Sequence, residues 1–180
     1  MRRVIASNLM SIDGFFEGPR HEIDWFSVEK EFLAYARSLL SSVDTILFGR
    51  ATWEHMAAYW PTAPADLVAN KMNSLHKIVF SNTLTSAAWA HSTIARGDAA
   101  AVVARLKSLP GADMVILGSG ALASSLLQAC LVDQYRVIVN PVILGSGNPL
   151  FQNICPRIRM KLTGVRRFST GVVILSYQPQ

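Results

Sequence analysis

Apolar residues fall into two kinds of pattern along the chain. Short continuous apolar runs, bounded by polar residues or glycine, are typical of buried strands. Such runs occupy Val4 to Met10, Thr45 to Gly49, Lys77 to Ser81, Met114 to Leu117 and Tyr135 to Val139. Between them, longer segments place apolar residues three or four positions apart, which is typical of amphipathic helices. The first 140 residues therefore alternate strands with helices.

The clearest helical pattern follows Ser27, a suitable N-cap residue. Its apolar face is formed by Val28, Phe32, Tyr35, Leu39 and Val43. Composition predicts further helices at Ala51 to Tyr59, Asp66 to Leu75, Ala99 to Leu109 and Ala121 to Ala129. The segment from Trp89 to Ala95 is expected to add one more strand.

The last part of the chain has a different pattern. Arg157 to Phe168 and Gly171 to Gln178 predict two strands joined by a turn at Ser169-Thr170-Gly171. Alternating strands and helices followed by a hairpin predict an α/β architecture. Its sheet should be mixed, mostly parallel, with antiparallel strands at one end. No segment has the composition of a linker or a repeat, so one domain is expected over residues 1–180.

Composition limits the classes of protein that remain. The 180 residues are 51% hydrophobic and 16% charged, which is too apolar for a disordered chain. No apolar stretch reaches the roughly 20 residues that a bilayer-spanning helix needs, so no membrane partner is expected. Cys130 and Cys155 form no CxxC pair and have no histidine at ligand spacing, which predicts no metal site. Two free thiols and no secretory pattern after Met1 favour a cytoplasmic protein.

The formal charge of +5 is unevenly distributed. Residues 131–180 hold six basic side chains and one acid, Asp133. The basic residues are Arg136, Arg157, Arg159, Lys161, Arg166 and Arg167. They largely alternate with apolar residues, which favours a solvated face of the final strands over an anion-binding role. No nucleic-acid-binding motif accompanies them, so no nucleic-acid partner is expected.

Three strand ends lead into small or polar residues. These are Gly49-Arg50-Ala51-Thr52, Ser81-Asn82-Thr83 and Gly118-Ser119-Gly120-Ala121. In open α/β sheets ligands bind at the carboxyl ends of strands, and the N-terminus of a helix attracts phosphate. The three segments therefore suggest a phosphate-bearing ligand, although each glycine could also serve only a tight turn. A Rossmann fingerprint is excluded, because its third glycine would fall at Ala123.

The order of motifs resembles that of a known superfamily. The motifs are Met10-Ser11-Ile12-Asp13-Gly14, Leu47-Phe48-Gly49-Arg50-Ala51-Thr52-Trp53-Glu54, Lys77-Ile78-Val79-Phe80-Ser81-Asn82-Thr83-Leu84, Ile116-Leu117-Gly118-Ser119-Gly120, and Leu131-Val132-Asp133-Gln134-Tyr135-Arg136 with Pro141-Val142-Ile143-Leu144-Gly145-Ser146-Gly147-Asn148-Pro149-Leu150-Phe151. Together they resemble the dihydrofolate reductase superfamily, and most of all the stand-alone proteins related to the reductase domain of the riboflavin-biosynthesis deaminase-reductase. The resemblance spans nearly the whole chain.

This resemblance implies a three-layer α/β/α fold that binds NADPH and passes hydride to a pterin- or aminopyrimidine-type ring. Gly49, Arg50, Ala51 and Thr52 would then lie at the pyrophosphate. Ser81, Asn82 and Thr83 would lie near the adenosine ribose and its 2′-phosphate. The turn at Gly118 and Ser119 would approach the cofactor closely, with Gly120, Ala121 and Leu122 opening the next helix.

Two positions depart from the family pattern. Many relatives carry arginine where Asn82 stands, so the preference for NADPH over NADH is less secure here, unless Arg50 compensates. The stretch from Leu39 to Ser42 lacks the arginine that phosphoribosyl-pyrimidine reductases usually place there, which weakens the case for a phosphorylated riboflavin precursor as substrate. The zinc ligands of the deaminase half are missing altogether.

Two carboxylates are candidates for assisting protonation. Glu31 matches the acid on the first helix of dihydrofolate reductases, with Glu29 as the alternative, and Asp13 lies in the loop that would cover the nicotinamide. Equally, Glu31 could be an exposed helix carboxylate and Asp13 a turn former. On the substrate side the candidates are Trp25 and the loop that contains Gly145 and Gly147.

The leading hypothesis is an NADPH-dependent reductase of a small heterocyclic substrate. The alternative is a catalytically weak or inactive nucleotide-binding dimer that senses a ligand on the same fold. A nucleic-acid or other anion binder ranks last. A homodimer is expected from the resemblance and because the terminal hairpin leaves a sheet edge to protect.

Overall fold

A computed structural model describes residues 1–180. The strands are β1 (Val4–Met10), β2 (Phe15–Glu17), β3 (Val43–Gly49), β4 (His76–Phe80), β5 (Ser92–Ala95), β6 (Asp113–Leu117), β7 (Gln134–Val139), β8 (Asn148–Pro149), β9 (Met160–Arg167) and β10 (Val173–Pro179). The helices are α1 (Lys30–Ser41), α2 (Arg50–Tyr59), α3 (Leu67–Ser74), α4 (Ala99–Ser108) and α5 (Gly120–Gln128), with a short 3-10 turn at Trp60–Thr62.

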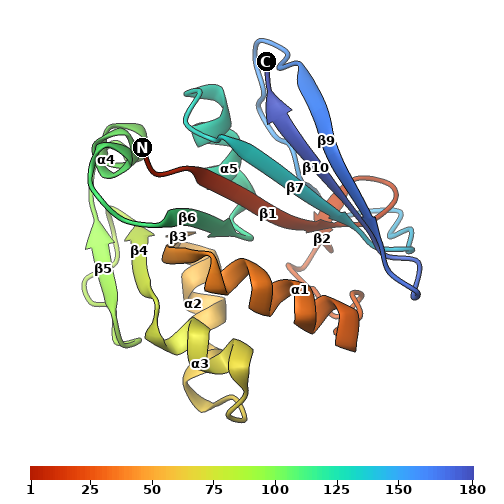
Figure 1. Ribbon diagram of the computed structural model, residues 1–180, viewed down its shortest axis with the longest axis horizontal. Coiled ribbons are helices and arrows are strands. Elements are labelled where there is room, and N and C mark those ends of the chain that lie inside the picture. The colour runs from red at the N-terminus through yellow and green to blue at the C-terminus, as the bar shows by residue number, and fades with distance from the viewer.

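Eight of the strands form one mixed sheet in the order β5-β4-β3-β6-β1-β7-β10-β9 (Figure 1). All pairs from β5 to β7 are parallel. Strand β10 is antiparallel to both β7 and β9, and β9 forms the edge of the sheet. The predicted mostly parallel sheet with a C-terminal antiparallel hairpin is confirmed.

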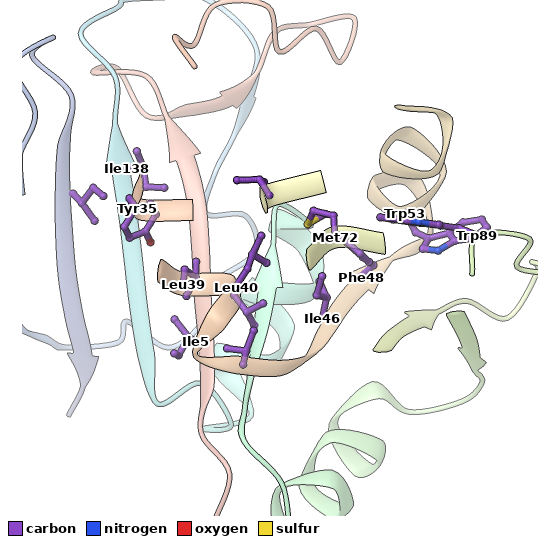
Figure 2. Packing of buried hydrophobic residues seen from close by; sticks show 14 of the residues in the cluster. Ile5, Tyr35, Leu39, Leu40, Ile46, Phe48, Trp53, Met72, Trp89 and Ile138 are labelled. Carbon is purple, nitrogen blue, oxygen red and sulfur yellow. The ribbon is translucent and has the colours of Figure 1, made fainter. Parts of the chain in front are cut away.

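Helices cover both faces of this sheet and give three layers. Helices α1, α2 and α3 pack on one face, where Leu39, Trp53 and Met72 join a buried cluster with residues of the central strands (Figure 2). Helices α4 and α5 supply Val103 and Leu126 to the cluster on the opposite face. Because alternate residues of a strand point to opposite faces, central strands that serve both clusters are largely apolar, with the buried Ser7 and Asn8 of β1 as exceptions. This explains the continuous apolar runs in the sequence.

One local prediction needs correction, and one small sheet was not predicted. The first helix begins at Lys30 with Glu29 as its N-cap, and Ser27 does not cap it. The hydroxyl of Ser27 instead donates to the Glu29 carboxylate at 3.0 Å. The small antiparallel sheet of β2 and β8 was not predicted, because strands of three and two residues are too short to show a period.

Ion pairs fasten the amino ends of the parallel strands. The buried guanidinium of Arg2 bonds Asp44 at the start of β3 and the carbonyl of Ala112 before β6. Arg3 pairs with Asp113 in two hydrogen bonds of 2.6 and 2.9 Å. Lys107 and Asp133 form a third pair, at 2.5 Å. These charged side chains are paired with one another within the protein. A ligand is therefore expected at the other ends of the parallel strands, their carboxyl ends.

None of the helices is long and apolar enough to cross a bilayer.

Candidate functional site

The carboxyl ends of the parallel strands lie along one edge of the sheet. Strands β4, β3 and β6 are neighbours in that order, so the segments that follow them lie next to one another. These are the three segments that the sequence singled out. Adjacent strands are about 4.8 Å apart, which brings the segments within the span of one nucleotide.

Two hydrogen bonds join the first and third segments directly. The backbone N–H of Gly49 donates to the hydroxyl of Ser119 at 2.9 Å. The backbone N–H of Ser119 donates to the hydroxyl of Thr52 at 3.1 Å. Both hydroxyls are therefore engaged within the protein, and Ser119 is only 6% exposed. These side chains fix the positions of two helix N-termini relative to each other.

The helices that follow β3 and β6 at this edge carry no side-chain caps at their N-termini. Helix α2 starts after Gly49 and α5 after Ser119, and neither N-cap side chain bonds the helix backbone. The first-turn residues are Arg50, Ala51 and Thr52 in α2 and Gly120, Ala121 and Leu122 in α5. By contrast, α3 and α4 are capped by the carboxylates of Asp66 and Asp98. An acidic cap would repel a phosphate, whereas free N–H groups at a positive dipole end attract one.

The turn between β6 and α5 is tightly packed. Gly118 has a φ of +62°, and a Cβ at this position would lie 3.0 Å from the methyl group of Thr52. Its carbonyl accepts a hydrogen bond of 2.8 Å from the side-chain amide of Asn8, which is 1% exposed. The Oδ1 atom of Asn8 is buried without a partner. A polar residue inside an apolar strand was the sequence feature that could have marked Asn8 as part of this site.

The second segment forms a loop that an arginine stabilises. The hydroxyl of Ser81 accepts from the N–H groups of Thr83 and Leu84 at 3.2 and 2.9 Å. Asn82 uses its side-chain oxygen to accept from the N–H of Gly97 at 2.8 Å. The guanidinium of Arg96 donates to the carbonyls of Asn82 and Leu84 at 2.9 and 2.8 Å.

Arg96 is therefore a candidate that the sequence analysis missed. An arginine was expected at the position of Asn82, after β4, whereas Arg96 follows β5. The pairing of β4 with β5 brings Arg96 next to Asn82. Two donors of its exposed guanidinium bond the loop, and the remaining N–H groups are available to an anion. Arg50, the position expected to compensate, pairs instead with Glu54 at 3.5 Å.

Asp13 joins two loops at this edge. Its carboxylate accepts from the hydroxyl of Ser11 at 2.7 Å and from the N–H groups of Leu144 and Gly145 at 3.1 and 2.7 Å. The bond from Ser11 and those from the backbone lower the pKa of Asp13. The carboxylate is therefore ionised at neutral pH, and its contacts hold the loop after β1 against the loop after β7.

Glu31 lies apart from Asp13 and contacts the terminal hairpin. Its carboxylate accepts from the backbone N–H of Ser169 at 2.7 Å and from the hydroxyl of the same residue. These two bonds lower the pKa of Glu31. The carboxylate of Glu29 accepts only from the hydroxyl of Ser27, within the same loop.

The loop after β7 packs against the loop after β1 over several contacts. Gly147 has a φ of +152°, and a Cβ there would lie 2.3 Å from the carbonyl oxygen of Glu17. Asn148 donates to the Glu17 carboxylate at 2.8 Å, and Leu150 donates to the carbonyl of Gly14 at 3.0 Å. The structure thus brings Asp13, Gly145 and Gly147 together.

Aromatic residues line the approach to β1 from the α1 side. Trp25 packs edge-to-face on Phe26 at 6.1 Å between ring centroids. Phe32 continues the row at 6.2 Å from Phe26 and 6.4 Å from Tyr35. The indole N–H of Trp25 is buried without a partner, and the hydroxyl of Tyr35 lies 3.0 Å from that of Ser7 on β1.

This edge combines features that suit a nucleotide. It has two uncapped helix N-termini, a close-packed glycine turn and a loop bonded by the exposed guanidinium of Arg96. No group of three or more His, Cys, Asp or Glu side chains is placed to hold a metal ion.

Comparison with protein families gives one match that covers almost the whole chain. A model described as the RibD C-terminal domain matches residues 2–174. The protein YyaP of Bacillus subtilis (strain 168) is 32% identical over 184 residues, which cover 98% of this chain and 94% of YyaP.

Solved structures share the fold at lower identity. A putative riboflavin biosynthesis protein from Shewanella sp. PV-4 superimposes with a TM-score of 0.78 at 20% identity, covering 100% of this chain and 99% of that chain. A dihydrofolate reductase from Enterococcus faecalis, complexed with NADP(H), has a TM-score of 0.68 at 16% identity, covering 99% of this chain and 96% of that chain. The expected fold of the dihydrofolate reductase type is confirmed.

Proposed function

Since the chain belongs to the RibD C-terminal domain family, we propose that it is an NADPH-dependent reductase that acts on a pterin- or aminopyrimidine-type heterocycle. The observation that carries the proposal is the pair of uncapped helix N-termini joined through Ser119. The B. subtilis and Shewanella proteins match this chain along nearly their whole lengths, which supports a function that resides in this domain.

The residues at this edge fit such a cofactor. Backbone N–H groups in the first turns of α2 and α5 would bind the pyrophosphate, and the tight turn at Gly118 would let the backbone approach it closely. The loop at Ser81 and Thr83 would face the adenosine ribose. When bound, NADPH supplies the hydride. The protein has to orient the two rings, exclude water and manage one proton.

We assign Asp13 and Glu31 an electrostatic part in protonation. Both carboxylates have hydrogen-bond partners that keep them ionised, so neither is suited to donate a proton. An ionised carboxylate still assists protonation, because it stabilises the cationic form of a nearby ring nitrogen. Asp13 is the better placed of the two, since it bonds the loop of Gly145 and Gly147 that we propose as the substrate side. Trp25 would contact the substrate ring from the α1 side.

The proposal is tested by titrating the purified protein with NADPH and NADH and following nicotinamide fluorescence. Binding of NADPH at micromolar concentration is the expected result, followed by its oxidation with dihydrofolate or a phosphoribosylaminopyrimidine. Binding without turnover of either substrate would favour the ligand-sensing alternative. If neither cofactor binds at high micromolar concentration, both the reductase and the nucleotide sensor are wrong.

Arg96 is expected to set the preference for NADPH. A charge-assisted hydrogen bond to the 2′-phosphate contributes about 1.5 kcal/mol, so Arg96→Gln should raise the Kd for NADPH roughly tenfold. The Kd for NADH, which has no 2′-phosphate, should stay the same. The measurement is the ratio of the two Kd values in wild type and variant.

Arg105→Gln is the matched control, because Arg105 is also exposed but lies in the last turn of α4. It should change neither Kd. Equal weakening of NADPH and NADH by Arg96→Gln would mean that the guanidinium only supports the loop through Asn82 and Leu84.

A homodimer remains part of the proposal. Strand β9 ends the sheet and exposes Leu162 and Val165, which are 49% and 61% accessible. An unpaired edge with apolar side chains favours association with a second copy.

Five of the six basic residues beyond Leu131 are exposed, in keeping with the solvated face expected for them.

A further inference from the structure

One cavity of the protein runs from Met10, at the carboxyl end of β1, along β7 and β10. It has a volume of about 530 Å³. It opens on the sheet face that carries α5, between that helix, the strands β7 and β10, and the loop that leads into β9. The lining residues are Met10, Leu127, Tyr135, Val137, Phe151, Ile154, Arg157, Ile158, Met160, Leu175 and Tyr177. Its size falls within the range of small-molecule sites.

The walls of the cavity are apolar and partly aromatic. Every lining residue except Arg157 is hydrophobic, and the rings of Tyr135 and Phe151 lie 5.2 Å apart at an angle of 48°. The hydroxyl of Tyr135 is buried without a hydrogen-bond partner. Such walls favour a flat or chain-like apolar body.

Arg157 supplies the one charge. It is exposed at the cavity and forms no ion pair with any acid of the chain. The only acid among residues 131–180 is Asp133, which is already paired with Lys107. The guanidinium of Arg157 therefore has no acidic partner within the chain, and a ligand that complements it must be an anion.

We propose that this cavity binds an amphiphilic anion, with an apolar body against the exposed ring of Phe151 and a carboxylate or sulfonate on the guanidinium of Arg157. A guanidinium presents paired N–H donors that match the two oxygens of such a group. The site lies on the opposite face of the sheet from α1 and from the aromatic row at Trp25. It does not depend on the proposed reductase function.

The experiment compares two fluorescent probes that differ only in charge. These are 8-anilinonaphthalene-1-sulfonate and N-phenyl-1-naphthylamine, which has the same ring system without the sulfonate. The wild-type chain is expected to bind the anionic probe with a micromolar Kd that saturating NADPH does not change. Arg157→Gln should weaken the anionic probe about tenfold and leave the neutral probe unchanged.

Two further variants locate the site. Ile154→Trp, which adds a large side chain from the loop, should weaken both probes because it fills the cavity. Arg159→Gln is the matched control, since Arg159 is an exposed arginine of the same segment that does not line the cavity, and it should affect neither probe.

Three outcomes would overturn the proposal. Displacement of the anionic probe by NADPH would assign the probe to the cofactor edge. Equal affinity of the wild type and Arg157→Gln for the anionic probe would show that Arg157 does not recognise its charge. If sedimentation equilibrium shows a dimer and the probe binds only on dilution to the monomer, the cavity is covered by a second copy. Failure of NADPH to bind leaves this proposal standing, because its readout is the probe alone.

Discussion

Replacing Gly147 with alanine is expected to separate the two loops that form the proposed substrate side. The added Cβ would lie 2.3 Å from the carbonyl oxygen of Glu17, which is backbone and cannot rotate away. The φ of +152° is also strained for any residue with a side chain. Overpacking together with backbone strain should lower the free energy of unfolding by about 3 kcal/mol. Urea denaturation measures this loss, and faster proteolysis within residues 142–150 would show that the loop has opened.

Gly145→Ala provides the matched control in the same loop. Gly145 also has a positive φ, of +75°, but no atom lies within 4 Å of the position that a Cβ would take there. Only the left-handed backbone should then oppose alanine, at about 1 kcal/mol. If the two variants are equally stable, the close contact with Glu17 does not hold the loops together.

Removing the charge of Lys77 is the second large effect that we expect. Lys77 is fully buried, and its ammonium donates to the carbonyls of Met72, Asn73 and Leu75 at 2.8, 3.2 and 2.7 Å. It also lies 4.5 Å from the ring centroid of Trp89. The last carbonyls of a helix have no partner within it, so this lysine satisfies the C-terminus of α3 from inside the core. Lys77→Met should leave these acceptors unpaired and cost about 2 kcal/mol at pH 7.

The free energy of unfolding that Lys77→Met loses should depend on pH. Burial lowers the pKa of Lys77 to about 8, from 10.5 in the unfolded chain. Between these values the unfolded state binds more protons than the folded one, so this lysine adds stability as the pH rises. The difference in unfolding free energy between wild type and Lys77→Met should therefore grow from pH 8 to pH 10.5. Urea denaturation across that window is the measurement.

Lys71→Met serves as the control for Lys77→Met. Lys71 lies in the last turn of the same helix but makes no hydrogen bond through its ammonium. Its replacement should change stability little and without this pH dependence. A difference for Lys77→Met that falls above pH 8 would contradict the lowered pKa of this lysine.

The fold was largely predictable because the central strands are buried on both faces. Continuous runs such as Val4 to Met10 and Thr45 to Gly49 can belong only to a covered, mostly parallel sheet, and the helices between them have clear periods. Helix starts were less predictable. Ser27 has the chemistry of a cap, yet the helix begins at Lys30, and the hydroxyl of Ser27 bonds the Glu29 carboxylate instead.

The candidate site was predictable as a set of segments but not as a set of contacts. Gly49, Thr52, Gly118 and Ser119 come together as the strand order implies. The hydrogen bonds that the hydroxyls of Thr52 and Ser119 accept could not be predicted from the sequence, since each joins residues about 70 positions apart. Arg96 was not predicted for the same reason. Only the pairing of β4 with β5 brings it next to Asn82.

The separation of ion pairs and binding loops between the two ends of the sheet has an evolutionary consequence. The pairs of Arg2 with Asp44 and Arg3 with Asp113 lie at the amino ends of strands that are roughly 15 to 20 Å long. Substitutions at such distances act on stability almost independently. Loops at the carboxyl edge can therefore diversify toward new substrates while the opposite edge preserves the folding free energy. A scaffold divided in this way is a suitable starting point for directed evolution of substrate choice.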